Sequence, residues 1–305
     1  FDVSQSLIEY SNASSYGRAF WVGLLNTLLV AALGIVAATV IGFIVGISRL
    51  SSNWLVARLA TAYVEIVRNL PLLLQLFFWY FAVLKTLPAP RQSHVLPGGA
   101  FLNVRGLYLP APVPQPGFDA VAIAFGVALL LAIGLWAWSR RHQRVTGRRM
   151  PVFWPSLLIV VALPLVAFLA TGGPLSLSYP ELRGFNFQGG LALQPELIAL
   201  LLGLSIYTAS FIAEIVRAGI VGVPKGQTEA AQALGLSNAH TLRLVVIPQA
   251  LRIIIPPLTS QYLNLTKNSS LAVAIGYPDF VSVFTGTVLN QTGQAVEVIL
   301  MTMGV

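Results

Sequence analysis

Long apolar segments alternate with short polar ones along most of the chain. A helix needs about 20 apolar residues to cross the hydrocarbon core of a bilayer. Six complete segments meet this requirement, and a seventh begins near residue 294 and reaches the end of the sequence. The pattern therefore predicts an all-α membrane protein whose spans cover residues 20–47, 57–84, 119–138, 151–171, 195–222, 247–267 and, in part, 294–305.

Basic residues between the spans indicate the orientation of the chain. Five arginines lie within Arg140–Arg149, between the third and fourth spans, and such clusters stay on the cytoplasmic side. Residues 86–118, which contain seven prolines, are then expected to form an irregular external loop. Residues 1–19 are also external in this arrangement, so we expect one further span before Phe1.

Composition agrees with a membrane protein and excludes several other classes. The chain has 305 residues, of which 56% are hydrophobic and 9% charged. Soluble domains carry about 25% charged residues, so this chain has too few to cover a soluble surface. It contains no cysteine, which excludes disulfides and thiolate metal sites. The net charge of +8 comes from loop residues, so nucleic-acid binding is not expected.

Residues 223–247 predict a structured cytoplasmic loop. A helix is expected over 227–234, Gly235 suits the left-handed position after it, and Ser237 can cap a second helix. A small apolar face that can dock into a groove on a partner protein is formed by Ala230, Ala231 and Leu234. On these grounds alone, a structured loop without a partner remains equally open.

Several segments resemble those of one transporter family. Glu229-Ala230-Ala231, followed by Gly235 and by Val245–Pro248, resembles the EAA motif of ABC importer permeases. Arg68–Leu76 and Leu265–Leu271 resemble segments of polar-amino-acid permeases. Asn69-Leu70 departs from the usual Gly-Thr, and this departure, with the inserted spans, is similar to the larger permease subunit of general L-amino-acid importers.

The resemblance implies a type I ABC importer transmembrane domain. Its five-helix core would be the spans over 20–47, 57–84, 195–222, 247–267 and 294–305, with 119–138 and 151–171 as an inserted pair. It also implies a heterodimer with a second permease subunit, two ATPase subunits, a periplasmic amino-acid-binding protein and an amino-acid substrate, in a bacterial inner membrane. Coupling to the ATPase is then expected at Glu229, Ala230, Ala231, Leu234 and Gly235.

Nucleotide chemistry is not expected on this chain. The sequence contains no Gly-x-x-x-x-Gly-Lys-Ser/Thr segment, which cradles ATP phosphates in P-loop proteins. ATP and Mg²⁺ are therefore expected on the partner ATPase, and no cofactor, metal or catalytic residue is expected here.

Charged and polar residues within the spans are candidates for a substrate path. Glu65 and Arg68 lie three apart, as do Glu214 and Arg217, so each pair can meet on one helix face. A lone charge at the bilayer centre costs about 2.5–3.5 kcal/mol, which pairing offsets. An inner gate and a structural ion pair both fit. The candidate path comprises Glu65, Arg68, Asn69, Gln75, Thr208, Ser210, Glu214, Arg217, Gln261, Asn264 and Lys267.

A stripe of small residues runs along the first span. Gly34, Ala38, Gly42 and Gly46 recur every four residues, a spacing that lets another helix approach closely.

Two other functions are weaker interpretations. An ion-gradient-driven secondary amino-acid transporter would need a paired half with broken helices, and no internal repeat is visible. An intramembrane enzyme is disfavoured because neither His-Glu-x-x-His nor Gly-x-Ser-x-Gly occurs. ATP-dependent uptake that survives collapse of the ion gradients would favour the ABC importer.

The orientation can be tested by labelling, because the chain contains no cysteine. Single cysteines at position 144 and within 86–118 should react differently with a membrane-impermeant reagent. The loop cysteine should be labelled from outside and the cysteine at 144 only from inside, because positive charge resists translocation. External labelling at 144 would reverse the predicted orientation.

Overall fold

The structure is a computed structural model that describes residues 8, 15–147 and 151–303. Within these residues, five helices are long and apolar enough to cross a membrane, and a bent helix pair can supply a sixth span. The predicted helical membrane architecture is confirmed. The chain divides into two compact units, the first formed by Phe1–Ser93, Leu102–Leu107 and Leu193–Val305, and the second by His94–Phe101 and Tyr108–Ala192.

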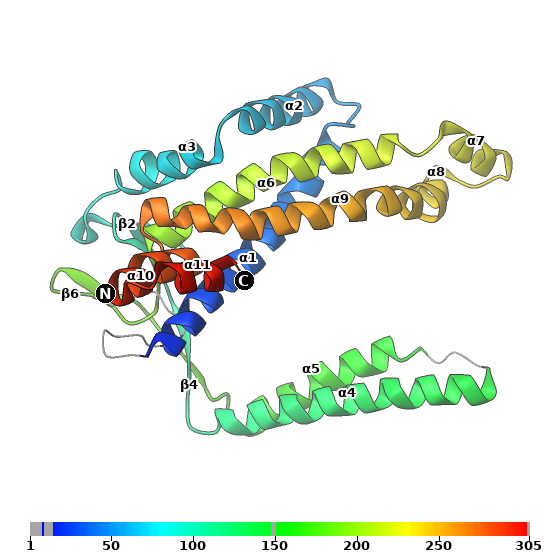
Figure 1. The fold of residues 1–305 in the computed structure, drawn as a ribbon. Coiled ribbons are helices and arrows are strands. Elements are labelled where there is room, and N and C mark those ends of the chain that lie inside the picture. The colour runs from blue at the N-terminus through cyan, green and yellow to red at the C-terminus, as the bar shows by residue number, and fades with distance from the viewer. Residues whose placement is uncertain (1–7, 9–14, 148–150, 304–305) are drawn as a thin grey trace. The chain divides into compact units, whose positions relative to one another are not determined.

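The first unit holds most of the helices (Figure 1). Its elements are α1 (Tyr16–Ser48), α2 (Trp54–Asn69), α3 (Leu72–Phe77), η1 (Phe78–Leu84), η2 (Pro90–Gln92), α6 (Pro195–Val221), α7 (Lys225–Ala233), α8 (Asn238–Thr241), η3 (Leu242–Val246), α9 (Ile247–Asn268), η4 (Ser269–Ile275), η5 (Ser282–Val288), α10 (Leu289–Thr292) and α11 (Ala295–Met303).

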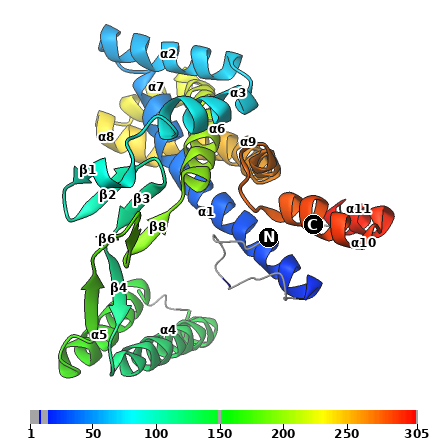
Figure 2. The ribbon, with the colours of Figure 1, turned by 90° about the vertical axis from the view of Figure 1, so that its left-hand side faces the viewer.

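Helix α6 is the central element of this unit. Helix α1 crosses it and α9 runs alongside it (Figures 1 and 2). In the most apolar 18-residue stretch of each helix, 56% of α6 is buried inside the protein, compared with 28% of α1. Leu200, Leu204 and Ile212 are fully buried among the neighbouring helices. The hydrophobic core of the first unit is therefore organised around α6.

Close approach of α1 to α6 depends on the predicted stripe of small residues. A Cβ atom at Gly42 would lie 2.6 Å from the Ile212 side chain, and one at Gly46 would lie 2.7 Å from the Ala213 carbonyl oxygen. Ala38 is fully buried. The stripe therefore does receive a second helix, as the sequence indicated, and that helix is α6.

Residues 57–84 do not form the single span predicted from the sequence. They form α2, α3 and η1, with an angle of 104° between Trp54–Asn69 and Leu72–Leu84. Pro71 explains the break, because proline disfavours helical geometry in the residue before it. Leu70 is accordingly extended, with φ −95° and ψ 129°.

The other core spans lie close to the ranges predicted for them. Helices α1, α6 and α9 correspond to 20–47, 195–222 and 247–267. Helix α11 lies within the partial span 294–305, whose last two residues are outside the described part of the chain.

The second unit contains the inserted helix pair. Helices α4 (Phe118–Thr146) and α5 (Phe153–Ala170) pack along each other, and Ala128 and Ser139 of α4 are buried. Most of their surface is exposed, because only 6% of the most apolar stretch of α4 and none of that of α5 is buried. Arg140, Arg141 and Arg144 lie on α4 and not in a loop as predicted, whereas Arg148 and Arg149 fall outside the described residues.

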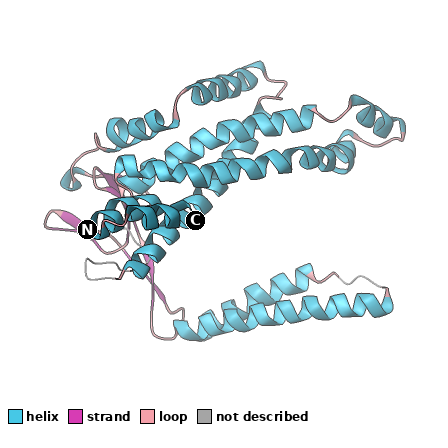
Figure 3. Cartoon of the chain, viewed as in Figure 1, coloured by secondary structure: helices cyan, strands magenta, loops and turns pink. Residues whose placement is uncertain are grey.

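Short strands precede and follow the helix pair along the chain (Figure 3). The strands are β1 (His94–Leu96), β2 (Ala100–Asn103), β3 (Gly106–Leu109), β4 (Ala111–Pro114), β5 (Leu175–Ser178), β6 (Glu181–Arg183), β7 (Asn186–Gln188) and β8 (Leu191–Leu193). One sheet has the order β1-β2-β3-β8, and β4–β5 and β6–β7 form antiparallel pairs. The prediction of an irregular loop over 86–118 is therefore wrong, because four strands lie within it.

Adding volume at the contact between α1 and α6 should destabilise the protein. Gly42→Val should lower the free energy of unfolding by about 1–3 kcal/mol, because the added methyl groups would collide with Ile212. Thermal unfolding in detergent measures the change. The control is Gly134→Val on α4, where no described atom lies within 4 Å of an added Cβ. Equal melting temperatures for the two variants would show that the glycine contact does not limit packing.

Candidate functional site

The two short helices of the predicted loop are α7 and α8, and local hydrogen bonds define where they meet. The Leu236 N–H donates to the Ala231 carbonyl at 3.1 Å and the Gly235 N–H to the Gln232 carbonyl at 2.9 Å, the paired bonds of a Schellman cap. Gly235 has φ +78°, which favours glycine. Ser237 accepts a backbone N–H to cap α8. The predicted helix stop and cap are confirmed.

The exposed surface of α7 differs from the predicted docking face. Ala231 is 4% exposed, so it packs inside the loop and cannot contact a partner. Leu234 is 83% exposed, and Ala230 is exposed as well. Glu229 is exposed but lies beyond the first helical turn, because α7 begins at Lys225. Ala231 thus differs from the predicted exposed face, the coupling role of the loop stays a prediction, and Leu234 is the most exposed large apolar side chain of the described loop.

Helix α8 continues into α9 without a break. Asn238–Ile275 forms one helical segment of 38 residues. Within it, the Ile247 N–H donates to the Leu242 carbonyl, which makes a widened π-turn. Pro248 explains that turn, because it has no N–H to donate to the carbonyl four residues earlier. Helices α8 and α9 are therefore parts of one helical segment that contains this turn.

A side-chain contact ties α7 to the same helix. The Gln249 amide of α9 donates to the Gln227 carbonyl oxygen of α7 at 3.2 Å. The loop is thus joined to α9 both through the chain and through this hydrogen bond.

A polar cavity of about 470 Å³ contains many of the predicted intramembrane charges. It brings together residues from α2, α6 and the end of α1. Its lining consists of Arg49, Val64, Glu65, Arg68, Asn69, Phe211 and Glu214. Four of these, Glu65, Arg68, Asn69 and Glu214, belong to the predicted substrate path.

Glu214 is the shared acceptor at this cavity. Its carboxylate pairs with Arg49 and, at 2.6 Å, with the Arg217 guanidinium. The predicted pairing of Glu214 with Arg217 is confirmed. Arg49 lies one residue past the end of α1, a position that gives no sign in the sequence of a tertiary partner.

Glu65 and Arg68 do not form the expected ion pair. The Arg68 guanidinium lies 5.0 Å from the centre of the Phe211 ring, a cation–π contact. Both side chains are exposed on α2. The prediction of two equivalent intrahelical pairs is therefore correct for α6 and wrong for α2.

Three other candidates are buried in the first unit. The Gln75 amide donates to the carbonyls of Val67 and Leu70 at 2.9 and 3.0 Å, so it stabilises the end of α2 at the break. Ser210 is fully buried and donates to the Tyr207 carbonyl at 2.6 Å, and Thr208 is 2% exposed. These side chains serve packing within the subunit and do not line the polar cavity.

The candidates on α9 lie on its surface. Asn264 and Lys267 are exposed and Gln261 is half-buried. Spacings of three bring these three residues to one side of the helix. This side of α9 is polar although the helix is long enough to cross a membrane.

The described residues contain no candidate metal site. Within residues 8, 15–147 and 151–303, no group of three His, Asp or Glu side chains could hold a metal ion.

Comparison with known proteins identifies relatives along the whole chain. Residues 144–304 match the family of binding-protein-dependent transport system inner membrane components. The chain is 58% identical to the putative amino-acid ABC transporter permease protein YhdX of Escherichia coli over 306 residues, which cover 100% of this chain and 78% of the relative. It is 56% identical to the general L-amino acid transport system permease protein AapQ of Rhizobium johnstonii, over 98% and 74% of the two chains.

A solved structure shares the fold. The crystal structure of an amino acid ABC transporter with histidines matches with a TM-score of 0.54 at 20% identity. The match covers 95% of this chain and 86% of the other. At this identity it shows the architecture of the transmembrane domain alone.

Removal of Glu214 should damage the protein more than removal of Arg217. Glu214→Gln leaves two guanidinium groups without their acceptor, whereas Arg217→Gln leaves Glu214 paired with Arg49. The Glu214 and Arg217 side chains are half-buried, so each loss is smaller than the cost of breaking a fully buried pair, but the yield and melting temperature of purified Glu214→Gln should fall further than those of Arg217→Gln. Glu65→Gln, the same change at the same cavity but outside any described ion pair, is the control. Equal loss for Glu214→Gln and Arg217→Gln would argue against a shared acceptor.

Proposed function

Because the chain belongs to the family of binding-protein-dependent transport system inner membrane components, we propose that it is the permease subunit of an ATP-driven amino-acid importer in a bacterial inner membrane. The substrate class rests on the names of two relatives, both amino-acid permeases and each at least 56% identical to nearly all of this chain.

The exposed surface of the loop supports the proposed coupling of this chain to an ATPase. Leu234 is a large apolar side chain that stands exposed on a short helix held in place by its own caps. An exposed side chain of this kind suits insertion into a groove on a partner. We assign that partner to a pair of ATPase subunits, which bind ATP and Mg²⁺, because this chain has no phosphate-binding loop of its own.

The physical link from loop to membrane is the continuous helix. ATP binding and hydrolysis on the partner would displace α7 and α8, and α9 would follow because it is the same helical segment as α8. The hydrogen bond between Gln227 and Gln249 keeps α7 in register with this movement. A movement of the loop would thus move α9, which forms one wall of the proposed transport path.

The polar side of α9 supports a second permease subunit. Asn264 and Lys267 are exposed on a helix of membrane-spanning length, and such groups face protein or a water-filled cavity rather than lipid. A second, similar subunit opposite α9 would complete a path between the two chains. The heterodimer, with an external amino-acid-binding protein that delivers substrate, satisfies this requirement.

Within this subunit the polar cavity is the proposed inner part of the substrate path. An amino acid carries one positive and one negative group, and the cavity presents Glu65 and Arg68 as exposed charges of both signs. Glu214 is occupied by Arg49 and Arg217, so it holds the wall of the cavity in place.

The function can be tested by reconstitution. The chain is placed in lipid vesicles together with its partner subunits, a loaded binding protein and radiolabelled L-amino acids. The proposal predicts uptake that needs ATP inside and binding protein outside and that persists when ionophores collapse the ion gradients. Uptake that follows an ion gradient without ATP would instead identify a secondary transporter.

Coupling has a sharper test at Leu234. Leu234→Ser should reduce ATP-dependent uptake at least tenfold, the loss expected when a central apolar contact worth about 2 kcal/mol is removed. Subunit stability should not change, because Leu234 has little contact within the chain. Val145→Ser is the matched control, since Val145 is 86% exposed but lies outside the loop. Normal uptake by Leu234→Ser would remove this residue from the coupling surface.

Two further variants separate docking from loop folding. Ala231→Trp and Gly235→Val should also abolish uptake, but through distortion of the loop itself, because Ala231 is buried and Gly235 needs a positive φ. Limited proteolysis should cleave their loops faster than that of Leu234→Ser. Normal transport by both variants would show that the loop is not the coupling element.

A further inference from the structure

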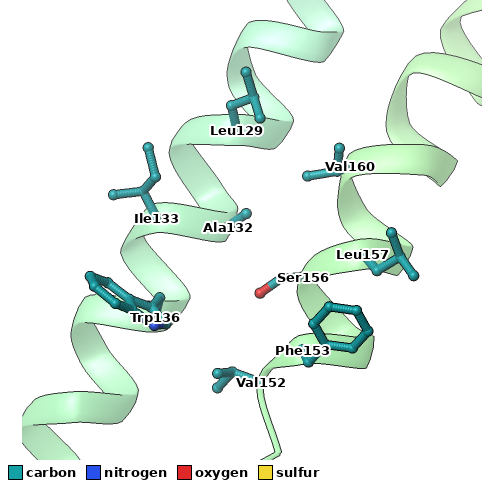
Figure 4. Close-up of a pocket in the computed structure, with 9 residues that line it drawn as sticks. All are labelled: Leu129, Ala132, Ile133, Trp136, Val152, Phe153, Ser156, Leu157 and Val160. Atoms are coloured by element: carbon teal, nitrogen blue, oxygen red, sulfur yellow. The ribbon is translucent and has the colours of Figure 1, made fainter. Parts of the chain in front are cut away.

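An apolar groove of about 470 Å³ lies between α4 and α5, in the unit that the proposed transport path does not use (Figure 4). Trp136, Val152 and Phe153 lie at one end of it, and Leu129 and Val160 lie at the other. Ser156 supplies the one polar side chain in the lining. Because α4 and α5 are almost wholly exposed, this groove is open to the surroundings of the helix pair.

Arginines continue the same face of α4 beyond the groove. Leu129, Ile133 and Trp136 line the groove, and steps of four residues from Trp136 lead to Arg140 and Arg144. Such steps keep side chains on one helix face. The Arg140 guanidinium confirms this placement, because it lies 3.6 Å from the centre of the Trp136 ring.

The cationic end of the groove has no acidic partner. Arg140, Arg141 and Arg144 are exposed and take part in no ion pair within the part of the chain that the structure describes. Two of them, Arg140 and Arg144, lie on the groove face and therefore stand at the end of an apolar channel between two membrane helices.

We propose that this groove binds one anionic phospholipid of the cytoplasmic leaflet. An acyl chain occupies the apolar channel along Leu129, Ile133 and Trp136. The phosphate is bound by Arg140 and Arg144, which lie on the same face at the channel's end. Arg140 reaches the phosphate while its guanidinium stacks on Trp136, so one residue joins the two parts of the site.

Charge and position favour a lipid over a protein segment. The groove is apolar over its length and cationic only at the end where arginines mark the cytoplasmic side. That distribution matches a phospholipid, which carries its negative charge at one end of an apolar chain. Basic pockets between membrane helices on this side recognise anionic headgroups in general.

Fluorescence quenching tests both parts of the site. The purified chain is placed in nanodiscs of phosphatidylcholine with a small fraction of phospholipid brominated on its acyl chain. The brominated lipid is either anionic phosphatidylglycerol or zwitterionic phosphatidylcholine. Bromine quenches the fluorescence of nearby tryptophans. The Trp136→Phe variant gives the fluorescence of the other five of the six tryptophans, and its difference from the unaltered chain is the signal of Trp136. Trp136 should be quenched at a lower mole fraction of the anionic lipid than of the zwitterionic one.

Neighbouring arginines provide the matched control. Arg140→Gln should reduce the preference for the anionic lipid about fivefold, which corresponds to about 1 kcal/mol for one basic residue at an anionic headgroup. Arg141→Gln changes the charge equally but lies off the groove face, so it should keep the preference. Arg140→Lys should retain most of it.

Three results would overturn the proposal. Equal quenching by both lipids would show that the groove does not select charge. Equal loss in Arg140→Gln and Arg141→Gln would reduce the preference to general attraction by a basic helix end. Absence of Trp136 quenching by either lipid would show that no acyl chain enters the groove, as expected if a protein segment covers it.

Discussion

Contact between helix backbones at α6 is the constraint on which the first unit depends. Glycines at 42 and 46 of α1 carry no side chain of their own, so the backbone of that helix lies directly against Ile212 and the Ala213 carbonyl of α6. Helix α6 offers the same opportunity to others: a Cβ at Gly203 would lie 2.5 Å from Leu76 of α3, and one at Gly219 would lie 2.3 Å from Ile254 of α9. In a membrane, where apolar surface gains little by leaving lipid, such van der Waals contact is a main source of helix association. The polar cavity and the loop thus depend on the close packing of α1, α3 and α9 against α6.

The charged groups follow from this packing. Because α1 approaches α6 so closely, the residue that follows α1, Arg49, reaches Glu214 on α6. Glu214 then balances two guanidiniums, and Arg68 uses the ring of Phe211 in place of an acidic partner. Of the charged side chains that line the polar cavity, only Glu65 on α2 lacks an ion pair or a cation–π contact within the described residues.

Features that depend on neighbouring residues could be predicted from the sequence, whereas features that depend on contacts between distant elements could not. Hydropathy located α1, α6 and α9 because span length is a property of a single segment, and Gly235 and Ser237 located the turn because capping involves only near neighbours. The sequence could not show that Ala231 faces inward, since α7 has alanines on both faces. Nor could it show the role of Arg49, whose partner lies 165 residues away. The prediction of one span over 57–84 misses the break at Pro71, whose 104° angle depends on the bonds from Gln75 and on the packing of α3 against α6.

The pairing of β4 with β5 has a consequence for the history of the chain. Ala111 lies opposite Ser178, and everything between them, α4 and α5 included, leaves and returns through this one two-stranded ribbon. Opposite residues in antiparallel strands are about 5 Å apart, so excision of the intervening segment would leave ends that a short turn can join. The helix pair is therefore a cassette that a single genetic event could insert or delete without altering the length of any other connection.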